Sequence, residues 1–190
     1  MQALWLLSIE AAEGGGPLPP AELRQLLELR ELSEPRDAPG STPWLSLDGR
    51  LARLYLPERI ALLASSSAGI TRTWRRLEGM QRLDGASAGE PAAWHYVVET
   101  EVLPEHEDDF NAWYAEEHLP GLAAVPGTLC AARYRDNAHP PRYHACYDLS
   151  HPQVLESPAW LAVRGTDWSS RVRPTFRNTR RTMFRSASGG

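Results

Sequence analysis

The clearest pattern of apolar and polar positions lies in the second half of the chain. Residues 94–103 alternate, with Tyr96, Val98 and Val102 on one side and Val97 and Glu99 on the other, which predicts a strand. A helix is expected to begin near Pro104, because acidic residues fill its first turns. Its apolar face carries Phe110, Trp113 and Tyr114, and Pro120 is expected to end it.

The elements that follow complete a regular order. Residues 128–135 and 142–149 read as two strands joined by a turn at 136–140. Ser157-Pro158 begins a short helical piece, with serine as cap and proline in the first turn, after a similar start at Ser150. Residues 175–185 read as the last strand. The order βαββαβ predicts an α+β fold of the ferredoxin-like kind.

The first half follows a related pattern less clearly. Residues 4–9 read as a strand and 20–32 as a helix, followed by strands at 50–56 and 59–64 and a helix at 70–80. A linker rich in glycine, serine and proline covers 85–91. The pattern indicates a degenerate tandem repeat, with one ferredoxin-like half at 1–88 and another at 92–186. The alternative is an unrelated N-terminal extension that covers the sheet.

Composition narrows the classes of function. The chain has 190 residues, of which 42% are hydrophobic, and a net charge of −4, which gives no reason to expect a nucleic-acid partner. All twenty basic residues are arginine, so a lysine Schiff base or lysine general base is excluded. No window resembles a signal peptide or a membrane span, and we therefore expect a cytoplasmic protein without a membrane partner.

One segment of the sequence resembles a known protein family. Trp113-Tyr114, His118 and Pro120, followed by a Pro126-Gly127 turn into a strand, resemble the end-of-helix motif of EthD-like and related dimeric α+β-barrel proteins. The resemblance covers about half of the chain. It implies a barrel closed by a second ferredoxin-like sheet and a pocket near the helix end. Relatives usually form homodimers, whereas a duplicated chain would close an intramolecular barrel. We expect intramolecular closure, with any homodimer formed through a separate surface.

His118 is the first candidate for chemistry. Asn111, Tyr114 and His118 are spaced by three and four residues, so they share one edge of the helix. At a helix end the dipole favours imidazolium, and a neighbouring tyrosine makes an acid/base pair with the histidine. We therefore expect His118, Tyr114 and Asn111 to be catalytic. The alternative is that His118 caps free carbonyl groups at the helix end.

The strand pair 128–149 supplies a second cluster. If its turn centres on Ala138, Cys130 faces Cys146, Ala132 faces His144, and Tyr134 faces Arg142. Tyr134, Arg142 and His144 then share a polar face that would bind substrate, and Trp168, in an expected loop, would join them. The alternative is a partly solvated face in which the two cysteines are small fillers. No histidine pair has metal-ligand spacing, so no metal or cofactor is expected.

Three functions fit these patterns. The first is a cofactor-independent lyase, isomerase or dehydratase of catabolism or secondary metabolism, acting on an aromatic or apolar small molecule with His118 as acid/base. The second is a non-catalytic small-molecule binding protein that uses the same pocket. The third is a haem-handling oxygenase, which the resemblance allows.

Overall fold

The computed structural model describes residues 2–32, 42–60 and 68–187, and these fall into two compact units. The first unit comprises residues 79–183, and the second comprises 2–78 together with the C-terminal residues from Phe184. Two long strands, β4 (Ile70–Asp84) and β8 (Phe176–Ser186), run from one unit into the other.

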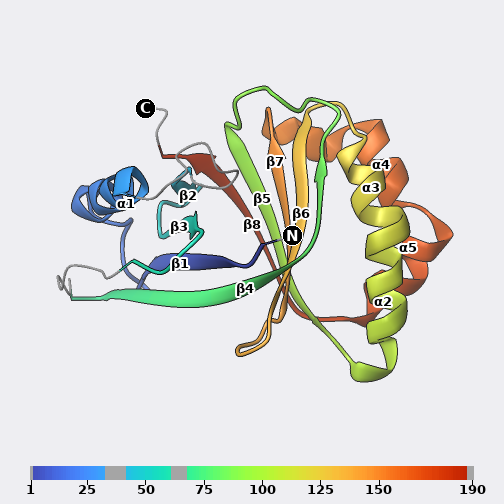
Figure 1. Ribbon diagram of the computed structural model, residues 1–190, viewed down its shortest axis with the longest axis horizontal. Helices are drawn as coiled ribbons and strands as arrows, with labels where there is room; N and C mark the ends of the chain where they lie inside the picture. Colours follow the sequence, from blue (N-terminus) through green and yellow to red (C-terminus); the bar gives the residue numbers. More distant parts are fainter. Residues whose placement is uncertain (1, 33–41, 61–67, 188–190) are drawn as a thin grey trace. The chain divides into compact units, whose positions relative to one another are not determined.

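The first unit has the predicted order of elements. Its strand order is β8–β5–β7–β6, which is the 4-1-3-2 order of a ferredoxin-like sheet with antiparallel β5–β7 and β6–β7 pairs. The helices lie along one face of this sheet (Figure 1). The remaining elements are β5 (Trp94–Val102), η1 (Pro104–His106), α2 (Glu107–Trp113), η2 (Tyr114–His118), α3 (Leu119–Ala123), β6 (Thr128–Asp136), β7 (Tyr143–Leu149), η3 (Pro152–Glu156), α4 (Pro158–Arg164), α5 (Asp167–Val172) and η4 (Arg173–Thr175).

The core of the first unit lies between this sheet and its helices. Phe110, Trp113 and Leu122 from the helical segment pack against Ala145 and Leu149 of β7, all of them buried. At the end of the helical segment, Gly127 makes the turn into β6 with φ +91. A side chain there would be strained and would meet Val154, so the Pro-Gly turn brings η3 close to the sheet.

Two local expectations for the first unit are corrected. Pro120 does not end the helix, because it lies in the first turn of α3 and the helical segment continues to Ala123. The segment 165–170 is not a loop: Thr166 Oγ1 accepts a hydrogen bond from the amide of Ser169, 3.1 Å away, and so caps α5. The capping of α4 by Ser157 is confirmed.

The second unit contains β1 (Leu4–Ala11), α1 (Pro20–Leu32), β2 (Trp44–Ser46) and β3 (Leu51–Leu56) with the first part of β4. Its strand order is β4–β1–β3–β2, with antiparallel pairs throughout. Leu26 and Leu29 of α1 pack on Leu7, Ile9 and Leu54 of the sheet. An ion pair of 2.6 Å between Glu22 and Arg72, both buried or nearly so, joins α1 to β4.

The helix expected at 70–80 is wrong, because these residues form strand β4. Trp74, Leu77 and Met80 are spaced as on a helix, which explains the expectation. Pairing with β1 makes the segment a strand instead, with Leu7 opposite Trp74 and Ile9 opposite Arg72. The strand expected at 59–64 falls largely outside the described residues. Arg59 and Ile60, which are described, are not part of a strand.

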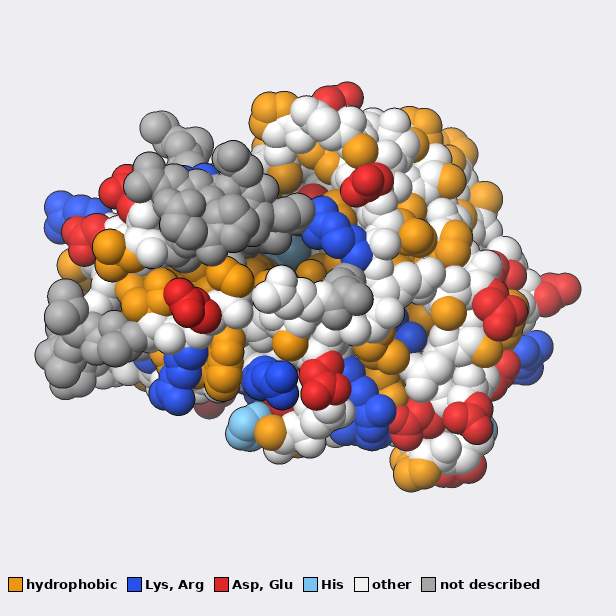
Figure 2. Space-filling model, in the orientation of Figure 1, with side chains coloured by type: hydrophobic (Ala, Val, Ile, Leu, Met, Phe, Trp, Pro, Cys, Tyr) orange, Lys and Arg blue, Asp and Glu red, His pale blue; other side chains and the backbone are white. Residues whose placement is uncertain are grey.

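On the face drawn in Figure 2, acidic and basic side chains are interspersed rather than gathered by sign. Among the described residues, no helix is long and apolar enough to cross a membrane.

Candidate functional site

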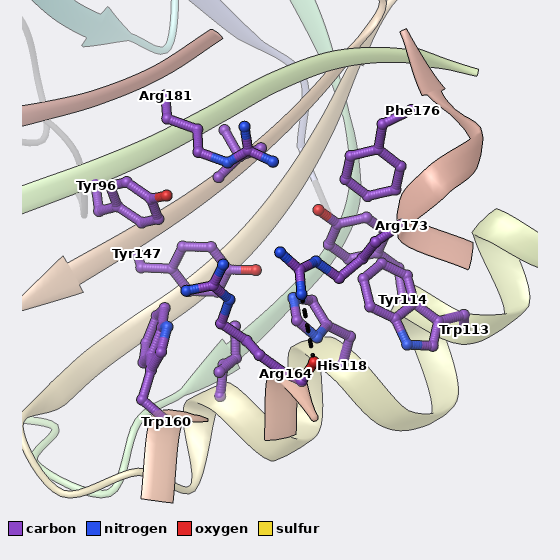
Figure 3. A pocket seen from close by; sticks show the side chains of 12 residues that line it. Tyr96, Trp113, Tyr114, His118, Tyr147, Trp160, Arg164, Arg173, Phe176 and Arg181 are labelled. Atoms are coloured by element: carbon purple, nitrogen blue, oxygen red, sulfur yellow. Dashed lines mark hydrogen bonds between the residues drawn. The ribbon is translucent and has the colours of Figure 1, made fainter. Parts of the chain in front are cut away.

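The first unit contains a cavity between its sheet and its helices. The empty space between its walls is about 380 Å³ when the open mouth is included. Its walls are mainly aromatic, with several polar groups among them (Figure 3). The lining residues are Tyr96, Val98, Trp113, Tyr114, His118, Leu122, Tyr147, Trp160, Arg164, Arg173, Phe176 and Arg181.

The sheet side of the cavity is made by two tyrosines in register. Tyr96 of β5 lies opposite Tyr147 of β7, and their rings stack with centroids 6.2 Å apart. Trp160 of α4 meets both rings edge-on, at 6.4 Å from Tyr96 and 5.3 Å from Tyr147. These contacts form a rigid aromatic wall, because each ring is held by two others.

The helical side is shaped by a π turn. In η2 the amide of Leu119 donates to the carbonyl of Tyr114, five residues earlier, rather than four. The same pattern would pair the carbonyl of Ala115 with residue 120, but Pro120 has no N–H, and Gln81 Nε2 donates to that carbonyl instead, at 3.2 Å. The wide turn therefore accommodates the proline without ending the helical segment.

One consequence of the π turn is the cluster Trp113, Tyr114 and His118. The His118 ring stacks on Trp113 with centroids 4.0 Å apart and an angle of 23° between planes. It meets the Tyr114 ring nearly at right angles, 5.3 Å away. Consecutive residues of an α-helix point about 100° apart, so bringing both 113 and 114 to one histidine depends on this local geometry.

The charge state of His118 differs from the sequence expectation. Its side chain is buried, and it lies inside the helical segment rather than at its end. Burial, reinforced by the positive charges of Arg173, Arg164 and Arg133, lowers the pKa of His118 from 6.5 to about 3. The imidazole is therefore neutral near pH 7, and the imidazolium expected from the helix dipole is corrected. His118 Nδ1 is buried and has no hydrogen-bond partner among the described residues.

Tyr114 is also held in its neutral form. Complete burial raises its pKa to about 12, although Arg133 acts in the opposite direction. The Arg133 guanidinium lies over the Tyr114 ring at 4.3 Å from its centroid. Asn111 does not line the cavity: its Oδ1 accepts a 2.6 Å bond from Arg133 Nη2 and so fixes that guanidinium behind Tyr114.

Tyr147 provides a second polar atom without a partner. Its side chain is buried, burial raises its pKa well above the usual value, and its hydroxyl has no hydrogen-bond partner among the described residues. A buried hydroxyl left unpaired costs about 1–3 kcal/mol. Unpaired groups of this kind at a cavity wall are typical of positions that meet a ligand.

The strand pair 128–149 has a different register from the expected one. Ala132 lies opposite Cys146, Tyr134 opposite His144 and Cys130 opposite Asp148, a shift of two residues with an irregularity between Thr128 and Cys130. The side chains expected to share a face still do so, because a two-residue shift preserves the alternation. The cavity, however, lies on the other face, which carries Tyr147.

The four residues expected to bind substrate therefore lie away from the cavity. Tyr134 and His144 are buried on the opposite face of the sheet. Arg142 precedes β7, and its Nε donates to Glu101 at 3.0 Å. Trp168 lies in α5 and donates from Nε1 to Asp109 Oδ1 at 2.9 Å. Of the seven expected site residues, His118 and Tyr114 line the cavity.

Several cavity residues had not been singled out from the sequence. Tyr96 and Tyr147 each lie on a strand face with other apolar residues, such as Val98 and Ala145, and this face was the available signal. Arg164, Arg173 and Arg181 come from three different elements, α4, η4 and β8, so no spacing along the chain relates them. Among the described residues, no three His, Cys, Asp or Glu side chains are grouped as metal ligands would be. Cys130 and Cys146 are buried free thiols.

Comparison with known proteins places this geometry in a fold group. No protein-family model matches the chain, and no curated protein matches it. Solved structures do. A protein from Fusobacterium nucleatum, described as a candidate monooxygenase, has a TM-score of 0.66 and 8% identity, with 97% of this chain and 92% of that chain covered.

Two proteins from Listeria monocytogenes extend the comparison. A haem-degrading enzyme has a TM-score of 0.56 and 11% identity, with 97% and 99% of the two chains covered. A ferredoxin fold protein related to antibiotic biosynthesis monooxygenases has a TM-score of 0.51 and 13% identity, with 97% and 95% covered. The chain shares the ferredoxin-like α+β fold of these proteins. At such low identity the likeness is one of fold, and the EthD-like assignment stays a proposal.

Proposed function

We propose that the chain is a cofactor-independent enzyme that moves a proton on an aromatic or enolisable small molecule in the first unit's cavity. The observation that carries this proposal is the neutral, buried His118, whose Nδ1 has no partner within the described residues and whose ring lines an aromatic cavity. A neutral imidazole is the form that accepts a proton, and exclusion of water keeps it available for a substrate.

The step assigned to His118 is proton abstraction. A C–H bond next to a carbonyl group breaks, the proton goes to an imidazole nitrogen, and the electron pair moves to the carbonyl oxygen as an enolate. Tyr114 and Tyr147 keep their hydroxyl protons because burial raises both of their pKa values. Each can therefore donate a hydrogen bond to the developing oxyanion. Isomerisation or elimination would follow from return or loss of groups on the same enolate.

Haem is a less suitable ligand for this cavity. A porphyrin is a large planar macrocycle, whereas the empty space between the cavity walls is about 380 Å³ even with the open mouth included. This space does not suit a macrocycle, and no step through haem is derived.

The proposal is tested with 2-tetralone, a two-ring enolisable ketone that carries no charge. Exchange of its α-hydrogens for deuterium in D₂O is followed by NMR with the full chain. We expect the wild type to accelerate exchange and His118→Gln to lose at least about tenfold of that acceleration, since general base catalysis contributes ~10²–10⁴. His106→Gln is the matched control, because His106 is exposed at the start of the same helical segment.

Two results would count against the enzyme. Equal acceleration by wild type and a folded His118→Gln variant would remove His118 from the chemistry. Binding of 2-tetralone in the cavity without any acceleration would favour the non-catalytic binding protein, the other function compatible with the cavity.

A further inference from the structure

Three guanidinium groups reach the cavity from separate elements. Arg164 ends α4, Arg173 begins η4 and Arg181 lies on β8. In Figure 3 all three extend into the space between the Tyr96–Tyr147 wall and the Trp113–Tyr114 wall. The one hydrogen bond among them joins Arg173 Nη1 to the carbonyl of Arg164, at 3.4 Å. Within the described part of the chain, none of the three is paired with a carboxylate.

This lack of acidic partners contrasts with arginines elsewhere in the protein. Arg142 contacts Glu101 at 3.0 Å and Glu107 at 3.2 Å. Arg171 contacts Asp109 at 2.9 Å. At the cavity, by contrast, burial lowers the pKa of Arg173, and the positive charges of Arg164 and Arg181 lower it further. Like charges held close together destabilise a fold, so their grouping around a cavity indicates an anion that offsets them.

The walls specify the rest of the ligand. The rings of Tyr96, Tyr147 and Trp160 form one apolar wall. The buried Tyr147 hydroxyl and His118 Nδ1 lack partners among the described residues. A guanidinium binds carboxylates through two parallel N–H groups, and aromatic walls accept a planar body. We infer that the substrate is an aromatic carboxylate whose oxyanion lies on Arg164, Arg173 and Arg181 and whose rings lie between the aromatic walls.

The inference rests on the proposed function and adds that substrate binding changes the basicity of His118. The positive charges of Arg173 and Arg164 help to keep His118 unprotonated in the empty cavity. A bound carboxylate offsets those charges, so the pKa of His118 rises once the substrate is in place. The base then becomes stronger in the complex with a carboxylate, while an uncharged ketone still meets the unprotonated imidazole of the empty cavity.

The experiment measures binding of three probes to the full chain by calorimetry. They are 2-naphthoate, its uncharged isostere 2-naphthamide, and inorganic phosphate. We expect 2-naphthoate to bind at least about tenfold more tightly than the amide, as a charge-assisted pair requires. Arg173→Gln and Arg164→Gln should each remove roughly tenfold of the 2-naphthoate affinity and leave the amide unchanged. Arg180→Gln is the matched control, since this neighbouring strand position points away from Arg181.

Each other result overturns the inference. Equal affinity for naphthoate and amide would show that no oxyanion is recognised. Phosphate binding as tight as naphthoate binding would show that the aromatic walls do not contribute. Arginine variants that retain full naphthoate affinity would place the carboxylate elsewhere. The proposed function is tested separately by hydrogen exchange of the uncharged 2-tetralone. If His118→Gln does not slow that exchange, the binding preference for 2-naphthoate is still decided by the calorimetry.

Discussion

At the scale of single residues, the charge state of His118 is the feature that the fold changes most. A histidine in water has a pKa near 6.5, and burial beside three arginines lowers that of His118 to about 3. The cost of keeping the imidazole unprotonated is not visible at neutral pH. The free energy of unfolding decreases on acidification, because the unfolded chain binds a proton at His118 that the folded chain does not bind.

This shift predicts a pH dependence of stability. Between pH 6.5 and about 3 the unfolded His118 is protonated and the folded one is not, so the free energy of unfolding falls as the pH falls through this window. The slope from this group approaches about 1.4 kcal/mol per pH unit. His118→Gln removes it, so wild type should lose stability more steeply than the variant between pH 7 and pH 4.5. Urea unfolding at several pH values measures the difference, and parallel curves would contradict it.

At the scale of elements, the π turn in the helical segment is the feature that makes the cavity. It brings Trp113, Tyr114 and His118 together and lets Pro120 lie within a continuing helix. Gln81 supplies the hydrogen bond to the Ala115 carbonyl that Pro120 cannot supply. Such π turns recur at functional sites, because the extra residue redirects side chains.

A double-mutant cycle tests this account of the π turn. Gln81→Ala should lower the free energy of unfolding by about 0.5–1 kcal/mol, the net worth of a typical hydrogen bond. In that background Pro120→Ala provides a backbone N–H for the Ala115 carbonyl and should offset part of the loss. Chemical denaturation of the wild type, both single variants and the double variant gives the coupling. Strict additivity would mean that Gln81 and Pro120 do not serve the same carbonyl.

At the scale of the whole molecule, the two units share a strand order. The first unit has β8–β5–β7–β6 and the second has β4–β1–β3–β2, which is 4-1-3-2 in both when strands are counted along each half. We propose on this ground that the halves 1–88 and 92–186 are a degenerate repeat.

The unit boundary makes a prediction about fragments. Residues 79–84 of β4 belong to the first unit, and Gly85 continues their course by donating to the carbonyl of Leu129 in β6, at 2.8 Å. A fragment of residues 90–190 lacks this segment and leaves the β6 edge uncovered, which favours self-association. A fragment of 79–190 retains it. Light scattering after size exclusion should show more association for the shorter fragment at equal concentration; the same mass for both would contradict this role of β4.

The amino-acid sequence alone determined much of the first unit. The strands at residues 94–102 and 143–149, the Ser157 cap and the order βαββαβ follow from local periodicity and capping chemistry, which act within a few residues. His118 and Tyr114 were found for the same reason, because their spacing lies on one helix. The segment 70–80 was misread as a helix, because its pairing with β1 joins residues about 59 to 73 positions apart in the sequence.

The tertiary structure decided the rest. Which face of the β6–β7 pair meets the helices is set by packing, and this placed Tyr147 in the cavity and left Tyr134 and His144 on the other side. Arg164, Arg173 and Arg181 meet only because α4, η4 and β8 converge on one cavity. Burial then fixed the protonation of His118. Local pattern therefore settles which elements form, while the electric field and the shape of the site arise from residues that only folding brings together.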